Sequence, residues 1–253
     1  SELAKYNAIH FPSPEYKRKV RNKEIIEKKY AKEKEKEFLF IYYKLLRKYQ
    51  INIEQEERDS FLGKWFIVTV REEIDFLSHE IQNIQKQDIR DVLAIILSRT
   101  VRSCRATTHS DLATLKEPVM ETYYCKKHGK ICKPIFSIMS WWETYTKDAL
   151  HRLEEFEHLR TDTLQVCLVA DSRTVDIYEE VRKIKPELGE NIKQKKIKGI
   201  FSSPPYVGLI DYHDQHAYAY EIFGFQRRDD MEIGAMFKGQ GEQARVEYIK
   251  GIS

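Results

Sequence analysis

With 253 residues, of which 33% are charged and 12% aromatic, the sequence has the composition of an ordinary globular protein and excludes a disordered chain. It contains no run of about 18 apolar residues, which argues against a segment that crosses a membrane. The first residues also lack the apolar stretch and the small-residue cleavage site of a signal peptide, so we expect a cytoplasmic protein.

The net charge of +3 is distributed unevenly along the chain. Residues 1–50 contain 14 Lys and Arg against 7 Asp and Glu, so this end is basic. A basic face suits the phosphate backbone of double-stranded DNA. The alternative is an ordinary solvated helix face.

Residues 1–103 are predicted to form a helical basic region. From Glu15 to Glu117 there is no proline and a single glycine, Gly63, as expected for successive helices. Residues 64–70 are rich in strand-forming side chains and are the one ambiguous stretch. The apolar residues recur at helical spacing in three groups, Phe38/Ile41/Tyr42/Leu45/Leu46, Ile74/Leu77/Ile81/Ile84 and Ile89/Val92/Leu93/Ile96.

Residues 104–160 are interpreted as a connecting or recognition region that includes a helix from about Ser137 to Leu159. Its second half contains Trp141 and Trp142, of which at least one is expected in the core. Cys104, His109, Cys125, His128 and Cys132 are of types that bind zinc, but their spacing is unlike the common paired zinc sites. We therefore predict reduced thiols and no metal, with a structural zinc as the alternative.

Residues 161–253 show a different pattern. Apolar runs at 166–170 and 197–201 flank a stretch with Val175, Tyr178 and Val181 at helical spacing, which predicts a strand, a helix and a parallel strand. Parallel strands place their carboxyl ends at the same sheet edge, where such sheets bind ligands. Asp171 and Ser203 would then lie at that edge.

The second apolar run leads into Ser203, Pro204, Pro205 and Tyr206. Two prolines end the strand and hold a rigid turn, because proline has a fixed φ and no backbone donor. A serine oxygen and a neighbouring carbonyl can accept both hydrogens of an amino group, while the tyrosine offers a ring for stacking. An exocyclic amino group of a nucleobase meets both requirements.

These four residues resemble the catalytic motif of the DNA amino-methyltransferases, which is Asp, Asn or Ser followed by Pro-Pro and an aromatic residue. The resemblance implies a Rossmann-like α/β methyltransferase fold with a partial parallel sheet, preceded here by the helical region. It also implies that S-adenosylmethionine methylates a base flipped out of DNA, in a restriction-modification context. Ser203, Pro204, Pro205 and Tyr206 would be catalytic, and serine at the first position favours N4-cytosine over N6-adenine.

The segment "VADSR" resembles the family's Gly-Asp-Ser segment, with Ala170 where glycine is common. The resemblance implies that Asp171 and Ser172 bind the cofactor, Asp171 at its adenine. A simpler interpretation is that one of them caps the following helix. Of three side chains that follow the catalytic turn, Tyr212, His213 and His216, each is expected to pack in a helix, with pocket lining as the alternative.

The family's other motif, Phe-x-Gly-x-Gly, is matched only by Phe237, Gly239 and Gly241, too soon after the catalytic motif for any usual order. We interpret these residues as a turn leading into a helix over 242–252. The resemblance therefore implies an incomplete methyltransferase that works with a further segment or a second subunit. The alternatives are a non-catalytic DNA-binding or specificity subunit, and an RNA or protein-glutamine methyltransferase.

Overall fold

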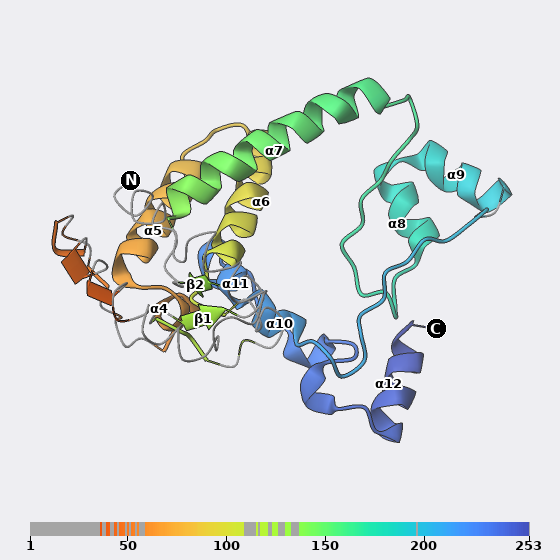
Figure 1. Cartoon of the computed structure of the whole chain (residues 1–253). Helices are drawn as coiled ribbons and strands as arrows, with labels where there is room; N and C mark the ends of the chain where they lie inside the picture. Colours follow the sequence, from red (N-terminus) through yellow and green to blue (C-terminus); the bar gives the residue numbers. More distant parts are fainter. Residues whose placement is uncertain are drawn as a thin grey trace, which may run out of the picture. The chain divides into compact units, whose positions relative to one another are not determined.

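The computed structural model describes residues 59–108, 115, 117–120, 123–125, 130–132, 137–195 and 197–252, and single residues or short stretches between 36 and 55 (Figure 1). The described chain divides into two compact units. The first unit comprises the described residues up to Arg152 together with Asp214–Arg227. The second unit comprises Leu153–His213 and the residues from Arg228 onward.

The first unit is built mainly from helices. Its described elements are α4 (Phe61–Trp65), α5 (Val68–Gln82), α6 (Gln87–Ser103), most of α7 (Ile138–Leu159) and α11 (Ala217–Phe223). A short antiparallel pair, β1 (Tyr123–Cys125) and β2 (Lys130–Cys132), completes it, with the Cα of Tyr123 opposite that of Cys132. The helix predicted from about Ser137 to Leu159 is thus confirmed as α7.

The core of the first unit follows the predicted spacing of α5 closely and that of α6 less well. Ile74, Leu77 and Ile81 of α5 are all buried, as predicted. On α6, Leu97 and Val101 are fully buried, whereas Ile89 and Val92 of the predicted stripe are exposed. The buried face of α6 therefore begins one turn later than predicted, and the core that it joins also contains Tyr218 and Ile222, which are distant in sequence.

The ambiguous stretch 64–70 forms no strand. It is the junction at which α4 ends and α5 begins, and Trp65, Phe66, Ile67 and Val70 are buried there. These side chains have a high strand propensity, but burial in a helical core outweighs that preference. The group that includes Phe38, Ile41, Tyr42 and Leu45 lies outside the described residues, although Leu46 is buried in the core.

Carboxylates from neighbouring helices cap two helix starts in the first unit. Glu73 accepts a hydrogen bond from the backbone N–H of Ile138 at 2.7 Å, and Glu221 accepts from those of Phe61 and Leu62. Amides in the first helical turn have no partner within their own helix, and a negative charge is favourable there. These contacts hold α7 to α5 and α4 to α11.

The second unit corrects the predicted fold class. It contains α8 (Ile177–Ile184), α9 (Pro186–Lys195), α12 (Glu242–Ile252) and the short helices η1 (Asp229–Met231) and η2 (Met236–Lys238). The four-residue α10 (Tyr212–Gln215) begins at its edge. Residues 166–170 and 197–201 are not strands, so the predicted Rossmann-like parallel sheet is wrong for the described structure.

The reason for the error is physical. An apolar run indicates that side chains become buried, but a strand also needs a neighbour that accepts its backbone hydrogen bonds. Within the described chain, neither run has such a neighbour. Between the two runs, the chain forms two helices, α8 and α9, where one was predicted. They pack so closely that a Cβ on Gly189 would lie 2.8 Å from the Cα of Arg182.

None of the described helices is long and apolar enough to cross a bilayer.

Candidate active site

The Ser-Pro-Pro-Tyr turn lies in non-helical backbone at the surface of the second unit. Ser203 and Pro204 are exposed, and the Tyr206 side chain is 61% exposed, so its ring has an accessible face. Within the described residues, neither the Ser203 hydroxyl nor the Pro204 carbonyl has a hydrogen-bond partner. Two acceptors and an aromatic face are therefore open to a ligand.

The next carbonyl is occupied. The hydroxyl of Tyr248, on α12, donates a hydrogen bond of 2.8 Å to the carbonyl oxygen of Pro205. This bond fixes the turn from its C-terminal side. Tyr248 thus positions the turn, a role that sequence reasoning did not assign to it.

The loop after the turn is held by the segment 232–240. The amide of Gly208 donates to the Gly234 carbonyl at 2.9 Å, and the amide of Phe237 donates to a carboxylate oxygen of Asp211 at 3.2 Å. Glu232, which is buried, accepts from the amide of Tyr212 at 2.5 Å. A fourth bond runs from the side-chain amide of Gln240 to the Val207 carbonyl at 3.4 Å.

Two glycines make this close packing feasible. Gly208 has φ of 61°, a left-handed conformation, and a Cβ there would lie 2.8 Å from the carbonyl carbon of Gly239. Gly234 has φ of 73°, and a Cβ there would lie 3.1 Å from the ring of Tyr248. Side chains at either position would push the two segments apart. Gly208, shortly after the motif, is a sign of close packing that the sequence contains, but it does not reveal that residues 232–240 are the packing partner.

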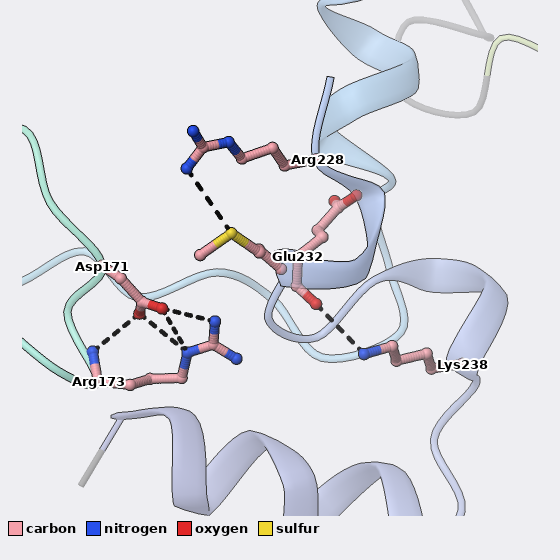
Figure 2. Close-up of polar contacts among 6 residues, drawn as sticks. Asp171, Arg173, Arg228, Glu232 and Lys238 are labelled. Atoms are coloured by element: carbon pink, nitrogen blue, oxygen red, sulfur yellow. Dashed lines mark hydrogen bonds and ion pairs between the residues drawn. The ribbon is translucent and has the colours of Figure 1, made fainter. Parts of the chain in front are cut away.

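Asp171 is engaged by Arg173 (Figure 2). The guanidinium donates to both carboxylate oxygens, at 2.9 Å and 3.2 Å from Nε and at 2.7 Å from a terminal nitrogen. The backbone N–H of Arg173 adds a bond of 3.0 Å. The side-chain hydrogen bonds from Arg173, followed by this backbone bond, lower the pKa of Asp171 to about 2. The aspartate is therefore charged, with its lone pairs largely used by one neighbour.

Neither predicted cofactor residue caps α8, so that alternative is wrong. The cap is Asp176, whose carboxylate accepts from the amide of Glu179 at 3.1 Å. The carbonyl of Asp171 instead accepts from the amides of Thr174 and Val175, which closes a turn before the helix. Ser172 is exposed in that turn.

Arg173 also lines a cavity of about 250 Å³ in the second unit. Lys238 and Glu232 also line it, and Figure 2 shows the hydrogen bond of 3.4 Å that the Lys238 ammonium donates to the Glu232 carbonyl. Its charged lining is balanced in sign, and consists of Arg173, Lys238, Lys250, Asp230, Glu232 and Glu247. Such a lining suits a polar ligand that carries both charges, such as an amino-acid group.

No hydrogen bond between described residues joins Asp171 to the Ser-Pro-Pro-Tyr turn. Both regions nevertheless contact the same C-terminal segment, because Gly234 lines the Arg173 cavity and accepts from the loop after the turn. Residues 230–251 thus connect the two predicted parts of the site.

The glycine-containing turn "MFKGQG" belongs to this connecting segment. Phe237 is exposed on η2, and Gly239 ends η2 with φ of 71°. Gly241 lies just before α12. The bounds of α12 confirm the predicted helix over 242–252. The turn packs on Gly208, two residues beyond the tyrosine of the catalytic motif.

Of the candidate zinc ligands, only Cys104 has a described side chain. It is buried, its sulfur lies 4.0 Å from the Ser137 carbonyl, and burial raises its pKa well above 9.0. His109 and His128 lie outside the described residues, as do the side chains of Cys125 and Cys132. The metal prediction therefore stays untested.

The remaining aromatic candidates pack within the protein. Trp141 and Trp142 both contact the core of the first unit while partly buried, and Trp141 lies 5.3 Å from the ring of Tyr145. Tyr212 and His213 are half-buried on α10, and His216 precedes α11 with its ring 6.2 Å from that of Tyr218. The contacts of the two tryptophans agree with the prediction that at least one of them packs in the core.

Comparison with known proteins supports the resemblance to a methyltransferase. No protein-family model and no solved structure matches the sequence. Over 255 aligned residues, however, the chain is 49% identical to the Type II methyltransferase M.MjaII of Methanocaldococcus jannaschii. The sequence is similar to part of a methyltransferase. The match covers 99% of this chain and 48% of the relative, so the chain spans about half the relative's length.

Proposed function

We propose that this chain carries the base-binding part of a DNA amino-methyltransferase of the restriction-modification type. The observation behind the proposal is the open acceptor pair of Ser203 and Pro204 beside the exposed ring of Tyr206. The 49% identity to a Type II methyltransferase supports it. N4 of cytosine is the favoured target and N6 of adenine the second.

The proposed mechanism depends on positioning. The target amino group donates one hydrogen bond to the Ser203 hydroxyl oxygen and one to the Pro204 carbonyl, while the base stacks on Tyr206. Two acceptors draw electron density toward the amino nitrogen and favour a tetrahedral geometry, which makes its lone pair available for attack. Tyr248 holds the Pro205 carbonyl and so keeps the turn in this conformation.

S-adenosylmethionine supplies the methyl group when bound. The predicted contact of Asp171 with the cofactor's adenine does not fit the described side-chain arrangement, because Arg173 already donates to both carboxylate oxygens. We propose that cofactor binding requires Arg173 to release Asp171. Calorimetric titration of S-adenosylmethionine tests this: Asp171→Ala should abolish binding, while Arg173→Ala should strengthen it.

The occupied aspartate also favours one alternative, a non-catalytic DNA-binding subunit. In that protein Asp171 and Arg173 would serve only to fix the turn before α8. Neither the wild type nor Arg173→Ala would then bind S-adenosylmethionine, although both would bind duplex DNA.

Transfer of a labelled methyl group to duplex DNA and to RNA tests the proposal itself. It is measured for this chain alone and for this chain co-produced with the part of the relative outside the match. Ser203→Ala should lower transfer to DNA by about 100-fold or more, because one amino-group acceptor is lost. Ser202→Ala, an adjacent exposed serine, is the matched control and should transfer at the wild-type rate. A preference for RNA would favour the RNA methyltransferase instead.

A further inference from the structure

Two apolar segments of the second unit, residues 164–170 and 197–201, are largely uncovered and are hereafter called the uncovered segments; only Val166 and Leu168 of their apolar side chains are half-buried. Val169 is 99% exposed, Ile200 87% and Phe201 102%, values expected of a side chain in an extended peptide. Scattered exposed apolar residues are ordinary, but runs of them indicate a surface that binds another molecule.

The backbone of the uncovered segments is equally unsatisfied. Both are non-helical, and among the described residues no backbone–backbone hydrogen bond involves 164–170 or 197–201. Water can satisfy these groups, but an apolar extended segment with open donors and acceptors is suited to pairing with another backbone. Side chains and backbone thus point to the same kind of event, which is association with polypeptide.

The similarity to the methyltransferase indicates which polypeptide. The match includes 99% of this chain, and hence the uncovered segments, yet it accounts for 48% of the relative. The relative therefore carries a comparable length of additional chain, held at high effective concentration because it is covalently attached. A second copy of this chain has no such advantage.

We propose that the uncovered segments bind the polypeptide that corresponds to the part of the methyltransferase relative outside the match, whether attached or supplied as a separate subunit. The apolar side chains of 164–170 and 197–201 become buried in this interface, and their amides acquire hydrogen-bond partners. The inference rests on the similarity to the relative and does not depend on methyl transfer.

Hydrogen–deuterium exchange tests the interface directly. Exchange is measured by peptide for this chain and for the full-length relative, and is corrected for the sequence differences. The positions aligned with the uncovered segments should exchange at least about 100-fold more slowly in the relative, because burial in an interface protects amides. The positions of α5 and α6, which pack in the first unit, serve as the internal control and should be protected similarly in both proteins.

Fast exchange at these positions in the full-length relative would overturn the proposal. Protection in this chain alone that rises with protein concentration would assign the surface to a second copy and would overturn it too. The exchange experiment is independent of the methyl-transfer assay. A relative that transfers no methyl group but is protected at these positions would contradict the proposed function and support the interface. A relative that is active but exchanges fast there would support the function and contradict the interface.

Charge substitutions supply a second test on this chain. Val169→Asp and Phe201→Asp should change its melting temperature by less than about 2 °C, because the side chains contact water already. A buried-core variant, Leu97→Asp, shows the response to a charge placed in a packed site. If Val169→Asp or Phe201→Asp unfolds the chain as Leu97→Asp does, these residues pack within the chain and the proposal fails.

Discussion

The two units differ in whether the side chains of their apolar segments are buried. In the first, Ile74, Leu97 and Val101 are fully buried among helices of the same unit. In the second, Val169 and Phe201 stand in apolar runs and are fully exposed. The largest fully buried side chains of the described chain all belong to the first unit. The difference shows that an apolar run predicts burial without identifying the partner that provides it.

Truncation of apolar side chains should sharpen this contrast. Leu97→Ala should lower the free energy of unfolding by about 2–5 kcal/mol, because it removes packed methyl groups and leaves a cavity. Ile200→Ala should change it by less than about 0.5 kcal/mol, since that side chain is exposed. Urea denaturation measures both, and similar losses in the two variants would contradict the contrast.

A smaller effect is expected where the second unit does pack against itself. Gly208→Ala should lower the free energy of unfolding by about 1–3 kcal/mol, because the residue has a positive φ and a methyl group would collide with Gly239. Gly199→Ala is the control, since no atom lies within 4 Å of its added Cβ. Equal stability of the two variants would show that the loop and the segment 232–240 do not pack as described.

The smallest effect concerns the charge of Asp171. Its pKa of about 2 lies below the ordinary 3.8, so it stabilises the fold above about pH 4 and loses that contribution as the pH falls toward 2. Arg173→Gln should return the pKa toward its ordinary value, because the guanidinium hydrogen bonds are the main cause of the shift. Carboxyl titration followed by NMR measures this, and an unchanged pKa would rule out that cause.

Local patterns predicted much of the first unit. Helical spacing identified the buried face of α5 and the existence of α7, because an amphipathic helix carries its period in its own sequence. The same reasoning placed α12 correctly. On α6 it failed for Ile89 and Val92, which are exposed, because periodicity identifies the apolar face of a helix but not the point along it at which packing partners end.

The second unit shows where such reasoning ends. The motif located an exposed, rigid turn, but the bonds that fix it come from Gly234 and Tyr248, which no local pattern connects to Pro205 or Gly208. The predicted sheet was wrong because strand pairing depends on a neighbour, and the described chain provides none for 166–170 or 197–201. Only interactions between near neighbours in the chain, such as Asp171 with Arg173 or Glu179 with Arg182, are visible in the sequence itself.

The most direct test of the account is the rate of methyl transfer to duplex DNA by Ser203→Ala relative to Ser202→Ala, in the preparation where the wild type is active. The two serines are adjacent and exposed, so folding affects both variants equally. The rate should be at least about 100-fold lower for Ser203→Ala, because Ser203, unlike Ser202, accepts a hydrogen bond from the target amino group. Equal rates would contradict the assignment of this turn as the base-binding site.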